Sequence, residues 1–80
     1  MKARDRFKTA RGDITAYALA CGYTQERYMS PGVHITLWHE GGPMYHVRAH
    51  DHAAGTRLFW HTTPSLKEAR AVYRLGRAPQ

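Results

Sequence analysis

Residues 45–60, YHVRAHDHAAGTRLFW, carry polar side chains at every second position of a segment whose composition is typical of β-strands. His46, Arg48 and His50 alternate with smaller or apolar residues, and His52 continues the pattern. Successive residues of a strand point to opposite faces of a sheet, so these cationic and titratable groups would share one face. Arginine suits phosphate groups and guanine edges. We therefore expect an exposed, cationic sheet face that contacts nucleic acid.

The same histidines raise the question of metal binding and catalysis. His50 and His52 could form a bidentate pair, with His61 approaching from the next strand, because zinc readily takes imidazole ligands. However, His46 and His50 are four strand positions apart, about 13 Å, which is too far for one ion. Cys21, the single cysteine, cannot form a cysteine pair for a structural zinc site, and no activating neighbour can be assigned to it. We predict no catalytic residue, no metal site and no cofactor.

Three short runs have the alternation typical of strands and would form an antiparallel meander. They are residues 33–39, 44–50 and 56–62, and the glycine-containing segments GGP and DHAAG separate them. After them, Ser65 and Glu68 form the Ser-x-x-Glu pattern of a helix capping box. Apolar residues then follow at helical spacing up to Gly76, which predicts a helix over residues 65–75: Leu66, Ala69, Val72 and Tyr73.

Residues 13–28, DITAYALACGYTQERY, fit two structures. A helix would begin at Asp13, end at Gly22 and place four residues on one face: Ile14, Tyr17, Ala18 and Cys21. A strand would place a different set on one face: Tyr17, Leu19, Cys21 and Tyr23. The strand is slightly favoured, and both alternatives stay open.

Strict alternation divides the predicted strands into two faces. The apolar face, which the helix would cover, contains Ile35, Leu37, Tyr45, Val47, Ala49, Leu58 and Trp60. The opposite face contains Thr36, Trp38, His46, Arg48, His50, Arg57, Phe59 and His61. One helix covers one face, so the second face should meet water or a partner. The predicted fold is α+β, an antiparallel meander of three or four strands with one C-terminal helix packed on one face.

Charge is concentrated at the beginning of the 80-residue chain, whose formal net charge is +6. Residues 1–11 contain one acidic residue, Asp5, and five basic residues: Lys2, Arg4, Arg6, Lys8 and Arg11. We predict that residues 1–11 form a basic flexible arm that contacts phosphates and that residues 12–80 form a single small domain. The longest apolar run is too short to cross a membrane. The basic N-terminus lacks the apolar core of a secretory signal, and a single cysteine fits a cytoplasmic location.

The segment YHVRAHDHAAGTRLFWHTTPSLKEARAVY resembles the three-stranded-sheet-plus-helix DNA-binding domains of plant ethylene-response factors and integrase arm-binding domains. In those domains a strand pair with arginine and tryptophan precedes a helix that starts Thr-x-x-Glu-Ala. The matching residues here are Ser65, Glu68 and Ala69 at the helix start and, in part, Trp38, Arg48 and Arg57 on the strands. The resemblance implies a sheet with one helix and DNA binding through the strands.

The whole chain is also similar to small uncharacterised proteins of actinobacterial phages, through GDITAYALACGY, YHVRAHDH and the LKEAR helix. That resemblance implies a location in the host cytoplasm, and it raises an alternative function, because small phage proteins often bind and modulate a host protein.

These observations favour a non-enzymatic nucleic-acid-binding protein, with DNA as the expected partner. The predicted contact residues are Lys2, Arg4, Arg6, Lys8, Arg11, Trp38, His46, Arg48, His50, Arg57, Phe59 and His61. The alternative is a phage-encoded protein that binds a host protein through the same sheet face. A third interpretation is a homodimer that uses this face as its interface, leaving nucleic-acid binding to the arm.

Deleting residues 1–11 should flatten the salt dependence of DNA binding and leave thermal stability nearly unchanged. Each lost phosphate contact changes the slope of log K against log salt concentration by about 0.9. Salt-titrated binding to random duplex DNA, before and after the deletion, measures the slope. An unchanged slope would exclude the arm from binding.

Overall fold

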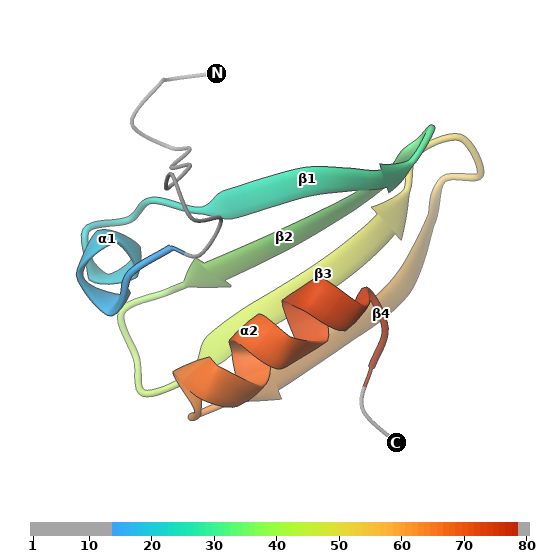
Figure 1. The fold of residues 1–80 in the computed structure, drawn as a ribbon. Helices are drawn as coiled ribbons and strands as arrows, with labels where there is room; N and C mark the ends of the chain where they lie inside the picture. Colours follow the sequence, from blue (N-terminus) through green and yellow to red (C-terminus); the bar gives the residue numbers. More distant parts are fainter. Residues whose placement is uncertain (1–13, 79–80) are drawn as a thin grey trace.

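The computed structural model of the chain describes residues 14–78, which form an antiparallel sheet of four strands with a helix across one face (Figure 1). The elements are α1 (Ala16–Ala20), β1 (Gln25–Ser30), β2 (Val33–His39), β3 (Tyr45–Asp51), β4 (Thr56–Thr63) and α2 (Leu66–Leu75). The strands lie in chain order, β1-β2-β3-β4. The predicted α+β class, meander and C-terminal helix are confirmed. The predicted arm lies outside the described residues.

The prediction of a strand over the first part of residues 13–28 is wrong, because the chain forms the short helix α1 there. Thr15 caps this helix, with its side-chain Oγ1 accepting a hydrogen bond from the Ala18 backbone N–H at 3.1 Å. The helical alternative was closer, but its buried face differs: Ala18 and Leu19 are buried, whereas Tyr17 is 80% exposed. Asp13, the cap expected in that alternative, lies outside the described residues. The remainder of the segment supplies the fourth strand, β1.

The turn between β1 and β2 needs glycine at Gly32. Its φ is +82°, a left-handed conformation that other residues rarely adopt, and a Cβ there would lie 3.3 Å from the Cβ of Ala53. The Gly32 carbonyl accepts a hydrogen bond of 2.7 Å from the backbone N–H of His52. This turn is therefore fastened to the neighbouring β3–β4 turn at the same end of the sheet.

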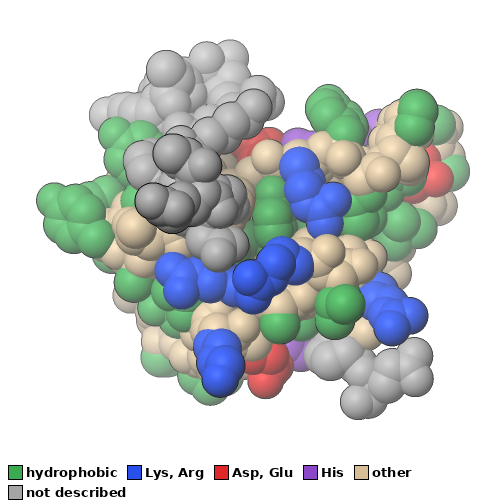
Figure 2. All heavy atoms as spheres, in the orientation of Figure 1, with side chains coloured by type: hydrophobic (Ala, Val, Ile, Leu, Met, Phe, Trp, Pro, Cys, Tyr) green, Lys and Arg blue, Asp and Glu red, His purple; other side chains and the backbone are tan. Residues whose placement is uncertain are grey.

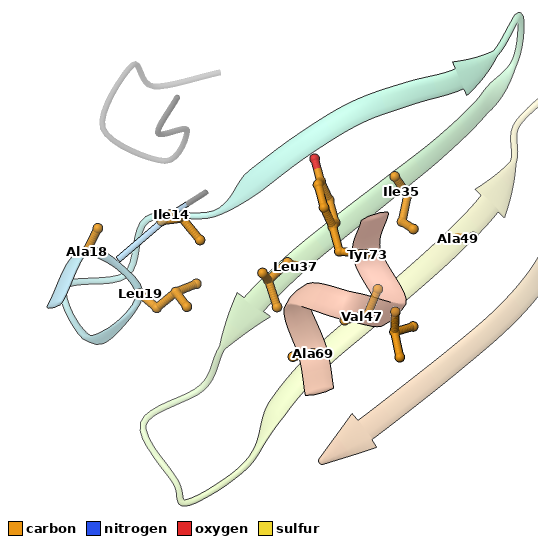
Figure 3. Close-up of a cluster of buried hydrophobic side chains, with 10 residues drawn as sticks. Ile14, Ala18, Leu19, Ile35, Leu37, Val47, Ala49, Ala69 and Tyr73 are labelled. Carbon is orange, nitrogen blue, oxygen red and sulfur yellow. The ribbon is translucent and has the colours of Figure 1, made fainter. Parts of the chain in front are cut away.

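The hydrophobic core lies between the sheet and the two helices (Figure 3). We call the sheet face that α2 covers the inner face and the opposite one the outer face. The core residues are Ile14, Ala18, Leu19, Ile35, Leu37, Val47, Ala49, Ala69, Val72 and Tyr73. Burial of each large apolar side chain contributes about 1.5–3 kcal/mol before the entropy cost. The predicted inner-face positions on β2 and β3 thus belong to the core, and the short α1 closes one end of it.

Two arginines fasten α2 to the rest of the domain. Arg27 on β1 donates a hydrogen bond from Nη2 to the Tyr73 carbonyl (2.8 Å) and to the Arg74 carbonyl (3.3 Å), near the C-terminal end of α2. Its guanidinium also lies 5.2 Å from the centre of the Tyr73 ring. Arg70 donates from Nη2 to the Ile14 carbonyl at 2.8 Å, which links α2 to the segment before α1. Burial raises the pKa of Tyr73 to about 12.

Ser65 begins α2 as predicted: its Oγ accepts a hydrogen bond from the Glu68 backbone N–H at 3.1 Å. The second half of the expected capping box is replaced. The Ser65 N–H donates to Thr63 Oγ1 (3.1 Å), and the Glu68 carboxylate lies 2.6 Å from His61 Nε2. The Glu68 side chain therefore ties α2 to β4 instead of closing the cap.

Replacing Ser65 with alanine should lower the free energy of unfolding by about 1 kcal/mol, because a backbone N–H at the helix start loses its acceptor. Urea denaturation followed by circular dichroism measures the change. Ser65→Asp, which keeps a capping oxygen, is the matched control and should retain most of the stability. Equal losses in both variants would contradict the capping role.

Candidate functional site

The pairing register between β3 and β4 determines which β4 side chains lie on the outer face. In the register, Arg48 lies opposite Trp60 and Ala49 lies opposite Phe59, so Trp60 shares the outer face with Arg48. The pairing then shifts, and His50 lies opposite Arg57, which leaves Leu58 as the extra residue of a β-bulge. The bulge returns Arg57 to the outer face. Arg48 and Arg57 therefore lie on the same face, as predicted.

The predicted facing of the rest of β4 is wrong, and the bulge is the reason. Phe59 and His61 were expected on the outer face, but Phe59 packs against the core and His61 contacts Glu68 of α2. Leu58 and Trp60 were expected in the core, but they are 53% and 45% exposed. An extra residue in a strand reverses the alternation beyond it. The candidate site thus loses Phe59 and His61 and gains Trp60.

Both described helices pack against the inner face, so no helix within residues 14–78 covers the outer face. The buried side chains of α1 and of α2 belong to one cluster with the inner-face residues of β2 and β3. Cross-strand pairing gives the outer-face residues as Glu26, Tyr28, His34, Thr36, Trp38, His46, Arg48, His50, Arg57, Trp60 and Thr62.

Three rings meet near one end of this face, and we call them the ring cluster: Trp38, His46 and Trp60. The Trp38 and His46 rings are stacked, with centroids 5.2 Å apart and planes at 24°. The two indole centroids are 5.3 Å apart with planes at 60°, and His46 meets Trp60 edge-on at 6.3 Å. Offset and edge-to-face arrangements of this kind are the favourable ones for aromatic pairs. The cluster therefore forms one continuous aromatic surface over β2, β3 and β4.

Hydrogen bonds hold the ring cluster in place. Trp38 Nε1 donates to a carboxylate oxygen of Glu40 at 3.0 Å, and the other oxygen of Glu40 lies 3.6 Å from His46 Nε2. His46 Nδ1 is 3.0 Å from Thr62 Oγ1, and Trp60 Nε1 donates to the same nitrogen at 3.5 Å. Both indole N–H groups therefore already have acceptors, Glu40 for Trp38 and His46 for Trp60. What the cluster offers to a ligand is ring surface, and Trp60 has the most exposed ring.

An arginine guanidinium also lies over each indole ring. The Arg48 guanidinium carbon lies 5.6 Å from the Trp38 ring centre, and that of Arg57 lies 5.4 Å from the Trp60 ring centre. Cation–π contacts at exposed positions contribute about 0.5–1 kcal/mol each. The two guanidiniums are therefore held beside the exposed aromatic surface, where they can pair with an anion that approaches it.

His50 lies further along the outer face, away from the ring cluster. Its ring centroid is 4.7 Å from that of His52, which in turn is 5.8 Å from the His34 ring. Within residues 14–78, no group of three histidine, cysteine, aspartate or glutamate side chains is arranged to hold a metal ion. The basic residues of the predicted arm lie outside the described residues, so their position relative to the outer face is not part of the structure.

Most described basic side chains lie on the helix side of the domain. Figure 2, in the orientation of Figure 1, shows lysine and arginine side chains gathered around α2. Of the seven Lys and Arg residues between positions 14 and 78, Arg48 and Arg57 lie on the outer face. The other five are on α2 or next to it: Arg27, Lys67, Arg70, Arg74 and Arg77. Charge alone therefore does not distinguish the outer face, whereas its aromatic surface does.

The geometry of the ring cluster has a direct optical test. Two indoles with centroids 5.3 Å apart couple their electronic transitions and should give an exciton couplet in the far-ultraviolet circular dichroism spectrum. Trp38→Phe and Trp60→Phe should each abolish the couplet, because one partner of the pair is lost. Tyr17→Phe, a change at an exposed residue of α1, is the control and should leave the couplet intact. A couplet that survives Trp60→Phe would contradict the pairing.

No protein-family model, curated protein or solved structure matches the chain. In residues 14–78, both helices are too short to cross a membrane. The function is therefore inferred from the residues of the outer face themselves.

Proposed function

We propose that the protein is a non-enzymatic nucleic-acid-binding protein, with DNA as its expected partner, and that the outer face is its binding surface. One observation carries the proposal: an exposed indole, Trp60, lies opposite Arg48 in the register and next to the Arg57 guanidinium, on a sheet face that no described helix covers. Exposed large aromatic groups on a surface commonly mark an interaction site. The basic residues at positions 2–11 would add phosphate contacts that do not depend on base sequence.

The chemistry of the three side chains fits nucleic acid. A guanidinium pairs with phosphate oxygens or with a guanine edge, and an indole stacks on a base or packs on a sugar. Arg48 and Arg57 each already touch an indole, so a nucleotide on the ring surface would bring its phosphate within reach of a cation. Aromatic stacking and phosphate pairing would then act on the same nucleotide.

A protein partner, such as a host protein in a phage setting, is the alternative, and one observation favours it. Leu58 and Trp60 are both about half exposed near each other on β4, and exposed tryptophan is a frequent anchor of protein interfaces. In that case the aromatic anchor would supply most of the binding energy, and charge removal would mainly slow association.

The double variant Arg48→Gln/Arg57→Gln should weaken DNA binding, by roughly 1–3 kcal/mol for each arginine that contacts a base. The matched control is Lys67→Gln/Arg77→Gln, which removes the same charge from exposed positions on the helix side. Fluorescence anisotropy of labelled DNA at low salt gives both affinities, and circular dichroism checks the fold. The outer-face variant should lose clearly more affinity than its control.

Equal losses in the two double variants would mean that binding follows net charge and not the outer face. Failure of the wild-type protein to bind any DNA or RNA at low salt would overturn the proposed function and favour a protein partner. For that alternative, Trp60→Ala should abolish capture of the partner, and the double arginine variant should lower the association rate.

A further inference from the structure

The outer face has little net charge of its own with which to attract a polyanion. Within the described chain it carries Arg48 and Arg57, but the carboxylates of Glu26 and Glu40 lie on or beside the same face. Duplex binding without base contacts depends on neutralising many phosphates. The outer face therefore offers mainly aromatic ring surface, and aromatic rings bind nucleic acid by stacking on its bases.

We infer that the outer face binds single-stranded nucleic acid by stacking bases on the ring cluster, an inference that rests on the proposed function. In a duplex each base is already stacked on its neighbours, so a protein ring cannot reach a base face without opening the helix. Unstacked bases of a single strand offer that face, and each stacked base contributes about 1–3 kcal/mol. Trp60, as the most exposed ring of the cluster, takes the first base.

The hydrogen bonds of the cluster indicate that this binding tolerates different base sequences. The Trp38 and Trp60 N–H groups donate to Glu40 and His46, so neither indole has a spare donor for a base edge. Every base has a π-face, which makes recognition by ring surface largely independent of sequence.

The arginines complete the binding of each nucleotide. A base that stacks on Trp60 replaces the Arg57 guanidinium over the ring, and the displaced guanidinium pairs with the adjoining phosphate. Arg48 lies beside Trp38 in the same relation and serves the neighbouring nucleotide. A sheet surface with a few aromatic rings accommodates about two or three bases. The expected ligand is therefore a short stretch of single strand.

Intrinsic fluorescence tests the inference directly, because Trp38 and Trp60 are the two tryptophans of the chain and both belong to the ring cluster. The full-length protein is titrated with a short oligothymidine, with a single strand of mixed sequence and with the duplex of that mixed sequence. We expect both single strands to quench the fluorescence and to bind more tightly than the duplex. The salt slope from the two outer-face arginines should be about 1.4, since single strands give about 0.7 per phosphate contact, with any contribution of the arm added to it.

Trp60→Leu should weaken single-strand binding roughly 5- to 150-fold, the factor that corresponds to one lost stacking contact. Trp60→Phe keeps an aromatic ring and should retain most of the affinity. The control is Tyr17→Leu, which removes an aromatic ring that is 80% exposed but lies on α1. Circular dichroism confirms that each variant is folded.

Each of the other results overturns the inference in a distinguishable way. Duplex binding as tight as single-strand binding overturns the preference for single strands but leaves the proposed function standing. Single-strand binding that Trp60→Leu does not change overturns the role of the ring cluster and assigns binding to another part of the chain. Failure to bind any of the three nucleic acids overturns the proposed function and the inference together.

Discussion

A sheet of four strands has two faces, and the helices of the described chain supply apolar surface for one of them. The inner face is filled by aliphatic side chains of β2 and β3 against Ala69, Val72 and Tyr73 of α2, with α1 closing the end. That packing fixes which face of every strand looks outward. Within residues 14–78 no helix covers the outer face, so its described side chains are held by contacts with one another and with their own strands. The candidate site follows from this constraint.

In the ring cluster, hydrogen-bond acceptors and arginine side chains stabilise the indoles on the uncovered face. An indole on an open sheet exposes apolar surface, which favours association with other molecules. Here Glu40 and His46 accept the two indole N–H groups, while Arg48 and Arg57 lie over the rings. Such contacts make Trp38 and Trp60 compatible with solvent, yet they are weak enough for a base or a partner side chain to replace the guanidiniums. The same arrangement that gives the indole N–H groups acceptors leaves ring surface exposed, as the proposed function requires.

The sequence predicted the parts of the fold that local patterns control. Residues 33–39 alternate without interruption and form β2 with the predicted bounds, and Ser65 and Gly76 begin and end α2. The outer-face placement of Trp38, His46 and Arg48 followed from alternation alone. Alternation failed on β4, because a bulge depends on pairing with β3 and leaves no sign in the sequence. The consecutive apolar residues Leu58, Phe59 and Trp60 also fit either face equally well.

The first helix was the less favoured of two alternatives for a related reason. Five residues of α1 are too few for a clear helical period, and alternate large side chains made a strand equally consistent with the pattern. Tertiary contacts decide the outcome: the Ile14 N–H donates to Gln25 Oε1 in the interior, and the Ile14 carbonyl accepts from Arg70. The Thr15 cap is local, but both of these partners lie outside the helix, so the local pattern contains only part of the information.

The distribution of arginines shows why net charge is a poor guide to the proposed binding surface. Arg27 and Arg70 add to the positive charge on the helix side, but their guanidiniums donate to backbone carbonyls of α2 and of Ile14. These two hydrogen-bonded arginines stabilise the fold. If their guanidiniums paired with phosphates instead, α2 would lose its hydrogen bonds to β1 and to Ile14. The Arg48 and Arg57 guanidiniums instead lie over the Trp38 and Trp60 rings, where a stacked base would replace them in the proposed function. A binding site needs guanidiniums that can leave their present contacts without unfolding the domain. Arg48 and Arg57 meet this condition, because each contacts an aromatic ring on the outer face and not the backbone of a helix.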